Sequence, residues 1–466
     1  MDYLERWYSV NRNEERLGTE PLGKLIFSLA LPSVLAQVVN LLYSIVDRIY
    51  IGHIPDVGAM ALTGLGLCMP ILLIVSAFAS FAGSGGAPRA AMELGRGSRE
   101  NASKILTNAF LMLIAFSIVL PAVLLSFKTP LLYFFGASDS TIKYANDYLS
   151  IYLCGTIFVQ LALGLNSFIA CQGQAKTAMA SVIIGALANI ILDPIFIFVF
   201  DLGVRGAAIA TVISQALSAA WVVRFLLSKK SVIRIDLRNL KPDMKVIGSI
   251  ASLGISPFIM QSTESLIAIV FTSGLQKYGG DLYVGTYTIL NSVMQLIFIP
   301  ANGFTYGTQP IISYNYGAGN YSRIKKNYCI ITGVALAYTA IFCTCVFIFP
   351  TALPALFTDD KALLELTASK LPIFIAGMIL FAIQMGAQTT LLGIGQAKIS
   401  LFIACLRKII LLTPLALILP RFFGVDGIYF AEPISDTISA LTSLGLFIYV
   451  CAKYRKTPRS SSGEEA

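Results

Sequence analysis

The chain has 466 residues, of which 56% are hydrophobic and only 13% charged, and its mean hydropathy is +0.75. This composition excludes an ordinary soluble globular protein and predicts a polytopic membrane protein. The formal net charge of +9 would suit nucleic acid or anionic lipid. The first twenty residues are polar and lack the short apolar core of a cleavable signal.

Twelve apolar segments of helical length follow one another along the chain. Each has ~20 residues or more, which is enough to cross a hydrocarbon core of ~30 Å. We therefore predict an all-α polytopic membrane protein with twelve transmembrane helices, and the even number places both termini on one side. The approximate spans are residues 24–51, 58–83, 105–127, 144–170, 177–200, 206–227, 247–275, 284–311, 328–357, 364–392, 399–419 and 427–451.

The distribution of positive charge predicts which side that is. With the N-terminus inside, 23 of the 34 Lys and Arg residues lie in inside segments, 6 in outside segments and the other five within helices. By the positive-inside rule both termini are expected in the cytoplasm and the protein in the cell membrane. The same bias explains the net charge, so the expected partner is the lipid bilayer and not nucleic acid.

The two halves of the chain repeat each other. Several Gly, Pro and Lys residues of the first half recur in the second at one constant offset: Pro88, Gly95, Gly97 and Lys104 as Pro310, Gly317, Gly319 and Lys326, and Gly-Gln-Ala-Lys at 173–176 as the same sequence at 395–398. A constant offset across separate loops indicates a duplication. Each half has six helices and starts inside, so the halves are expected as parallel repeats with substrate between them. The predicted units are a cytoplasmic N-terminal segment 1–23, a first lobe 24–227, a connector 228–246, a second lobe 247–452 and a cytoplasmic tail 453–466.

Cysteine and histidine usage gives no sign of a resident metal or cofactor. None of the eight cysteines has CxxC spacing, and the only histidine, His53, lies in a predicted loop. We expect the cysteines to be small apolar packing residues.

The polar stretch at residues 189–194, which reads Asn-Ile-Ile-Leu-Asp-Pro, lies within the fifth span. Asn189 and Asp193 are four apart and share one helix face. A carboxylate at that depth costs ~2.5–3.5 kcal/mol and usually faces a cavity or a partner. Pro194 cannot donate a backbone N–H, which frees a carbonyl one turn earlier. Such oxygens suit a hard cation or a proton; the alternative is a kinked helix with one packed polar residue.

Only the first half has this acidic pair, because the equivalent positions at the offset of the duplication are Leu411 and Leu415. Two further polar residues, Asp47 in the first span and Thr211 in the sixth, lie at a similar predicted distance from the outer surface. We therefore expect Asp47, Asn189, Asp193 and Thr211 in the outer half of one lobe. A surface pair of Asp47 with Arg48 is the alternative, although neighbouring residues on a helix point ~100° apart.

The second lobe has acids of its own: Glu264 in the seventh span, and Glu432 and Asp436 in the twelfth. Glu432 and Asp436 are four apart, and Arg407 and Lys408 in the eleventh span supply positive charge. This set predicts either an internal salt-bridge network or a second site for a substrate cation or proton.

Several local motifs, in this order and spacing, are similar to those of one transporter family. They are Leu-Pro-Ser at 31–33, Ile-Val-Asp-Arg-Ile at 45–49, Gly-Arg-Gly at 95–97, the stretch 189–196, Gln-Pro-Ile-Ile-Ser-Tyr-Asn-Tyr-Gly-Ala-Gly at 309–319, and Ala-Glu-Pro-Ile at 431–434. With them the chain resembles the MATE (multidrug and toxic compound extrusion) transporters of the MOP flippase superfamily, in the branch of MepA-like and DinF-like exporters. The resemblance covers residues 24–453.

The resemblance implies two six-helix lobes that export organic cations against influx of Na⁺ or H⁺. In the DinF-like branch the coupling ion binds in the first lobe, at positions that match Asp47, Asn189, Asp193 and Thr211. A transient Na⁺ at these four residues is the only metal expected, and no cofactor is expected. Pro32 matches a helix-one proline proposed there to permit bending, and Pro194 is a second hinge candidate.

The NorM-like branch instead uses acids in helices seven and ten. Glu264 fits the first of these, but the tenth span has only Glu365 near its outer end, so the chain departs from that pattern. Drug contacts are expected from apolar, aromatic and Met side chains. The candidates are Phe158, Met260, Met294, Gln295 and Tyr306.

Two other functions fit the sequence less well. A flippase for a lipid-linked or other endogenous metabolite would want a strongly cationic cavity, and here the acids outnumber Arg407 and Lys408. A membrane-embedded enzyme would need a His, Cys or Ser constellation, which the single loop histidine disfavours. The chain is therefore expected to be a monomeric antiporter of cationic and amphipathic drugs, and not an enzyme.

Overall fold

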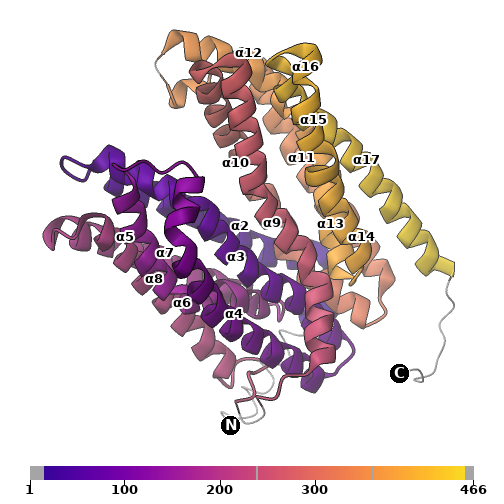
Figure 1. Ribbon diagram of the computed structural model, residues 1–466. Coiled ribbons are helices and arrows are strands. Elements are labelled where there is room, and N and C mark those ends of the chain that lie inside the picture. The colour runs from indigo at the N-terminus through magenta and orange to yellow at the C-terminus, as the bar shows by residue number, and fades with distance from the viewer. Residues whose placement is uncertain (1–14, 238–239, 359, 457–466) are drawn as a thin grey trace.

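The computed structural model describes residues 15–237, 240–358 and 360–456, and every regular element in these ranges is helical (Figure 1). The first six spans comprise α2 (Leu22–Gly52), α3 (Gly58–Gly95), α4 (Arg99–Phe134), α5 (Ile142–Cys154), α6 (Thr156–Ala170), α7 (Ala175–Pro194), η1 (Ile195–Val199) and α8 (Gly203–Leu227). The last six comprise α9 (Met244–Gly279), α10 (Asp281–Gly317), α11 (Tyr321–Ile348), η2 (Pro354–Leu356), α12 (Lys361–Ile375), α13 (Met378–Gly393), α14 (Ala397–Cys405), η3 (Leu406–Leu412), α15 (Thr413–Ile418), α16 (Pro420–Phe423) and α17 (Asp426–Lys456).

The predicted fold class is confirmed. Within the described ranges, ten helical stretches are long and apolar enough to cross a membrane, and two bent pairs supply the other two spans. The pairs are α5 with α6, bent by 59°, and α12 with α13, bent by 44°. The breaks fall at Gly155 and Gly377, which are equivalent at the offset of the duplication. The repeat thus extends to the bend within the fourth span of each lobe.

Several helices extend beyond the spans predicted from hydropathy. Helix α3 continues to Gly95 and α10 to Gly317, because hydropathy marks the apolar stretch and not the hydrogen-bonded helix. Two spans also contain π-helical turns, η1 directly after Pro194 and η3 across Leu406–Leu412. A π turn widens the helix locally and is frequent at functional sites.

The repeated glycines have a conformational reason. In three pairs of equivalent loops both members have positive φ, a region that side chains with a Cβ rarely adopt. The pairs are Gly97 (80°) with Gly319 (70°), Gly173 (79°) with Gly395 (76°), and Gly203 (53°) with Gly424 (60°). The duplicated scaffold therefore keeps glycine where the chain must turn.

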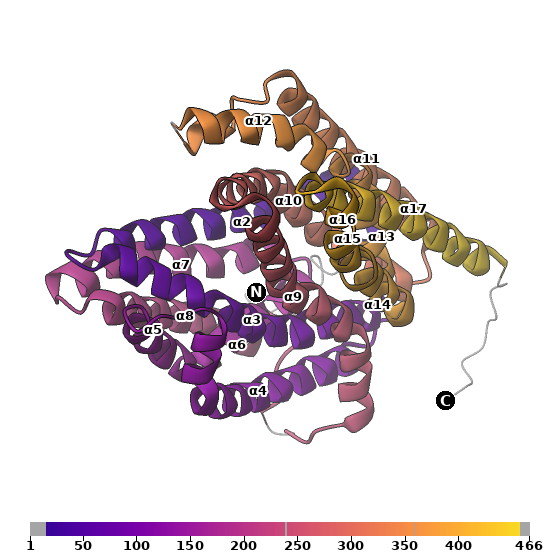
Figure 2. The same ribbon diagram turned by 45° about the horizontal axis from the view of Figure 1, so that its top comes forward.

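The two lobes, α2–α8 and α9–α17, meet where α3 and α10 end and diverge toward the opposite end (Figures 1 and 2). At the meeting end, a Cβ on Gly95 would stand 1.9 Å from the carbonyl oxygen of Tyr314, and a Cβ on Gly317 would stand 1.9 Å from that of Met92. Met92 and Tyr314 are themselves equivalent in the duplication, so the contact is reciprocal and follows the pseudo-symmetry. A second close approach joins Gly85 of α3 to Gly254 of α9.

The connector between the lobes lies against the first lobe. The side-chain oxygen of Gln172 accepts hydrogen bonds from Val232 N (2.8 Å) and Ser231 Oγ (3.0 Å). At the other end of the connector, Asp243 caps the N-terminus of α9 and its carboxylate pairs with Lys104 (2.6 Å). The connector is thus fastened at both of its described ends, and the predicted domain boundaries around it remain predictions.

The cysteines differ in part from expectation. Cys68, Cys171 and Cys343 are buried packing residues as predicted, and Cys405 is partly buried. The prediction was wrong for Cys154, Cys329 and Cys345, which are exposed on helix surfaces, because an apolar segment has a lipid-facing side as well as a packed one. Cys451 lies outside the residues whose side chains are described, as do the first fourteen residues and the tail from residue 457.

Candidate ion-binding site

Three of the four predicted site residues come together between α2 and α7. Asn189 and Asp193, one turn apart on α7, are 2% and 0% exposed. The Asn189 side-chain Nδ2 donates a hydrogen bond to Asp193 Oδ1 at 3.0 Å. From α2, the carboxyl of Asp47 lies within hydrogen-bonding reach of the Asp193 carboxyl. Two acids from different helices thus face each other directly.

The fourth residue, Thr211 of α8, reaches this pair through a tyrosine. Its side chain lies within hydrogen-bonding reach of the hydroxyl of Tyr148 on α5, and Tyr148 in turn interacts electrostatically with Asp47. Tyr152, one turn further along α5, stacks on Tyr148 with ring centroids 6.2 Å apart. Both rings are nearly fully buried, so they close one side of the site to water.

Sequence reasoning missed the tyrosines. Besides Tyr148 and Tyr152, Tyr43 of α2 interacts electrostatically with both Asp47 and Asp193. A signal was present, because Tyr43 lies four residues before Asp47 and therefore on the same helix face. The alternative pairing of Asp47 with Arg48 is not formed. Arg48 is exposed and makes no ion pair within the described residues.

The site contains buried oxygens that lack a donor. Asp47 Oδ1, Asn189 Oδ1 and Asp193 Oδ2 are each buried without a hydrogen-bond donor in the described part of the chain. A carboxylate oxygen can only accept, so a direct bond between two carboxyls requires a proton between them. Two ionised carboxylates in a place of low dielectric repel each other strongly. The arrangement is therefore suited to one shared proton or one small cation.

The described residues do not form a conventional metal centre. No group of three or more His, Cys, Asp or Glu side chains is placed to hold a metal ion in residues 15–237, 240–358 and 360–456. The oxygens of this site come instead from two carboxylates, one amide and a nearby hydroxyl, which is a ligand set for a hard monovalent cation or a proton.

The two hinge candidates behave differently. Helix α2 passes through Pro32 without a break, from Leu22 to Gly52. Pro194 ends the α-helical part of its span, and the π turn η1 follows at once. Asp193 therefore sits at the junction of two helix types.

The acids of the second lobe lie in an ion-pair network. Arg407 bonds Asp436 Oδ1 through Nε at 2.7 Å and Glu432 Oε1 through a terminal nitrogen at 2.8 Å. Its guanidinium also lies 4.3 Å from the ring centre of Phe381. Lys408 pairs with Glu264 and donates to the backbone oxygen of Met260 at 2.8 Å. The sequence left two alternatives for these residues, an internal salt-bridge network or a second site for a substrate cation or proton. The contacts observed are those of a salt-bridge network.

The candidate drug contacts are scattered. Met260 and Met294 are half-buried in the second lobe, and Met294 packs against its core. Tyr306 of α10 is half-buried, Gln295 is exposed, and Phe158 is 36% exposed on α6 in the first lobe. No contact in the described residues joins the five into one site. Met260 alone touches a polar cluster, because its sulfur lies 3.8 Å from Gln388 Nε2.

The sequence model of the MatE family matches residues 32–195 and again residues 257–418, which together make up more than half of the chain. The chain belongs to the MatE family. One match falls in each lobe, so the family assignment and the duplication support each other. The resemblance noted from the motifs is confirmed, and this MatE chain is a multi-pass membrane protein.

Curated relatives cover nearly the whole chain. It is 26% identical to the multidrug export protein MepA of Staphylococcus aureus (strain NCTC 8325 / PS 47) over 433 residues, which are 92% of this chain and 94% of that protein. It is 24% identical to MepA of Staphylococcus haemolyticus (strain JCSC1435) over 440 residues, 94% of this chain and 96% of that one.

Solved structures share the fold. One is an outward-facing conformation of a multidrug resistance MATE family transporter of the MOP superfamily, with a TM-score of 0.88 and 22% identity over 95% of this chain and 98% of that one. Another, from Pyrococcus furiosus, has the same TM-score, identity and coverage, and is described as having a binding pocket of reversed polarity that suggests a different function. Similarity at this level establishes the twelve-helix, two-lobe architecture.

Proposed function

We propose that this MatE protein is a secondary active exporter of cationic and amphipathic small molecules, driven by antiport of Na⁺ or H⁺ at the Asp47–Asp193 pair. The observation that carries the proposal is the group of buried oxygens without donors in the first lobe. The names of the MepA relatives support multidrug substrates. The role is transport of an unchanged substrate and not an enzymatic reaction.

The antiport follows from the charge of the pair. With no bound cation, two adjacent carboxylates repel and one proton or one Na⁺ is held readily. Asn189 orients Asp193 through its 3.0 Å hydrogen bond, and Tyr148, with Thr211 beside its hydroxyl, forms a polar wall next to Asp47. Binding of the ion lowers the negative charge of the pair from two to one and so favours release of a cationic drug, whereas loss of the ion restores the second negative charge, which attracts the next drug.

Alternating access follows from where the lobes touch. Their close approaches at Gly95 with Tyr314, Gly317 with Met92 and Gly85 with Gly254 involve the C-terminal parts of α3 and α10 and the N-terminal part of α9. We place both termini in the cytoplasm on the basis of the positive-charge bias. In that orientation the lobes are closed toward the cytoplasm, and a drug would leave between them on the outer side.

The flippase alternative lacks comparable support. It requires free positive charge deep in the membrane for a pyrophosphate. Arg407 and Lys408 are both deep, but each is paired with acids. We therefore keep drug export as the proposed function.

The test is efflux of a cationic dye from proteoliposomes, with Na⁺ and pH gradients imposed separately. We expect Asp193→Asn and Asp47→Asn to abolish ion-driven efflux in protein that remains folded and reconstituted. Asp56→Asn is the matched control, because Asp56 lies in an exposed loop at a φ of 62° that asparagine tolerates. Ion-driven efflux as fast in Asp193→Asn as in Asp56→Asn would contradict the proposed function.

A further inference from the structure

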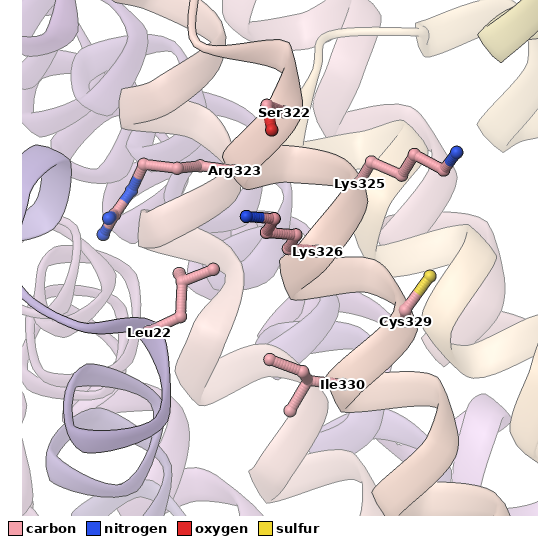
Figure 3. Close-up of a pocket in the computed structure, with 7 residues that line it drawn as sticks. All are labelled: Leu22, Ser322, Arg323, Lys325, Lys326, Cys329 and Ile330. Atoms are coloured by element: carbon pink, nitrogen blue, oxygen red, sulfur yellow. The ribbon is translucent and has the colours of Figure 1, made fainter.

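An open pocket of about 760 Å³ lies at the beginning of α11, beside Leu22 at the beginning of α2 (Figure 3). Three of its lining residues are cations, Arg323, Lys325 and Lys326, and no acidic side chain lines it. Arg323 and Lys326 extend toward Leu22 of α2 (Figure 3). Leu22 and Ile330 add an apolar part to the lining, so positive charge stands directly beside hydrocarbon.

The three cations differ in the hydrogen bonds and ion pairs that they form. Arg323 is partly buried and donates to the backbone oxygen of Glu20 at 2.8 Å, yet its Nε is buried without a partner. Lys325 and Lys326 are exposed and take part in no ion pair within the described ranges. Positive charge therefore accumulates here without a counter-charge from the described protein.

The pocket-lining face of α11 has a counterpart in the first lobe, on α4. At its constant offset, Ser103, Lys104, Thr107 and Asn108 of α4 are the counterparts of Lys325, Lys326, Cys329 and Ile330. The connector covers that face of α4. Its backbone N–H groups donate to Ser103 Oγ (3.2 Å), Thr107 Oγ1 (3.0 Å) and Asn108 Oδ1 (2.8 Å).

The counterpart of Lys326 is neutralised by that cover. The carboxylate of Asp243 lies 2.6 Å from the Lys104 ammonium, and the hydrogen bond from Lys104, with that from Val246 N, holds the pKa of Asp243 below its usual range. Thr107 and Asn108 are 3% and 1% exposed, whereas Ile330 is 37% exposed and Cys329 is exposed as well. The same helix face is thus covered by the connector, which carries an anionic side chain, in one lobe and is open in the other.

The residues that replace the polar ones indicate a different ligand. In the second lobe the hydrogen-bonding Thr and Asn positions have become Cys329 and Ile330. Below them, Val334 and Ile341 continue the exposed apolar side of α11, at 44% and 66% exposure. A headgroup with negative charge followed by a hydrocarbon chain matches this order of side chains, and a soluble anion would leave the apolar part unused.

We propose that this pocket binds an anionic phospholipid of the adjoining leaflet, with Lys325 and Lys326 contacting the phosphate and one acyl chain lying along α11. Basic pockets between transmembrane helices on the cytoplasmic side are suited to such headgroups. The site is separate from the ion site of the first lobe, and it does not depend on the proposed transport activity.

The test uses Cys329, which is exposed and lines the pocket, as a reporter in the purified full-length protein in detergent. The rate of alkylation at Cys329 is followed by peptide mass spectrometry while phosphatidylglycerol, phosphatidylcholine or inorganic phosphate is added. At a phosphatidylglycerol concentration ten times its dissociation constant, we expect the rate at Cys329 to fall about tenfold. Cys345 on the same helix and Cys154 in the first lobe, both exposed, should be unaffected.

Two variants decide whether the lysines are responsible. Lys325→Gln with Lys326→Gln should weaken the protection by phosphatidylglycerol about thirtyfold, the effect of removing two cations next to an anionic lipid. Lys176→Gln with Lys398→Gln removes two exposed lysines from the first turns of α7 and α14 and should leave the protection unchanged. Equal protection by phosphatidylcholine, equal protection by inorganic phosphate, or full protection in the Lys325/Lys326 variant would each overturn the proposal.

Discussion

At the scale of single residues, the ion site depends on groups that neutralise or orient Asp47 and Asp193. Asp47, Asn189, Asp193 and Thr211 were predicted from the depth of the two acids in their spans, from the absence of the acidic pair in the second half, and from the resemblance to the MATE transporters. The sequence could not show that the two carboxyls touch, since that depends on how α2 packs against α7. The sequence also offered no reason to assign Tyr43, Tyr148 and Tyr152, among the other aromatic residues, to the ion site.

Tyr148→Phe tests the orienting role of the tyrosines. It removes only the hydroxyl that lies within hydrogen-bonding reach of Thr211, and loss of one hydrogen bond costs about 1 kcal/mol. We expect a loss of about fivefold in apparent affinity for the coupling ion, measured from efflux rates at graded ion concentrations. Tyr152→Phe is the control, because no hydrogen bond of its hydroxyl is formed within the described residues. Equal effects of the two substitutions would show that the Tyr148 hydroxyl has no special part.

Arg407→Ala tests whether the second-lobe network is structural. The substitution leaves Glu432 and Asp436, which are 4% and 0% exposed, without their cation, and breaking such a buried pair costs about 3–5 kcal/mol. Thermal unfolding in detergent should show a large loss of stability. Lys370→Ala, which breaks a pair with the more exposed Asp426, should cost less than about 1 kcal/mol. A variant of Arg407 as stable as that of Lys370 would argue against a structural network.

At the scale of helices, the hydropathy pattern predicted all twelve spans but not their ends or breaks. It could not reveal that α5 ends at Cys154 and α12 at Ile375, because both sides of each break are apolar. The repeated glycines were visible as a pattern, and their purpose became clear only from the φ angles and the contacts between lobes. From the sequence, the connector was predicted only as the boundary between the lobes. In the structure its backbone N–H groups form hydrogen bonds with side chains of α4.

Gly95→Ala and Gly317→Ala test the reciprocal contact of α3 with α10. Each added Cβ would meet a backbone oxygen at 1.9 Å, so the helices must move apart, at a cost of about 1–3 kcal/mol. The midpoint of thermal unfolding in detergent should fall for both. Gly66→Ala on the same α3 has nothing within 4 Å of its added Cβ and should be neutral or stabilising by about 0.5–1 kcal/mol. If all three variants unfold alike, the close approach is not an energetic constraint.

At the scale of the whole molecule, the duplication predicted two six-helix lobes, and the double match to the MatE family agrees with it. The side on which the lobes close could not be predicted, because a transporter of this kind populates more than one arrangement of the same sequence. Likewise, the asymmetry between the covered face of α4 and the open face of α11 is a property of the folded lobes. The sequence shows only that the residues on the two faces differ.

The central claim is that the Asp47–Asp193 pair holds one ion that a cationic substrate displaces. The most direct measurement is the release of H⁺ and of Na⁺ into weakly buffered solution when a saturating cationic dye is added to the purified protein. Linkage between the two ligands predicts release of about one ion per wild-type molecule and none from Asp193→Asn, with Asp56→Asn behaving as wild type. Release of the same ion, in the same amount, from Asp193→Asn would contradict the account.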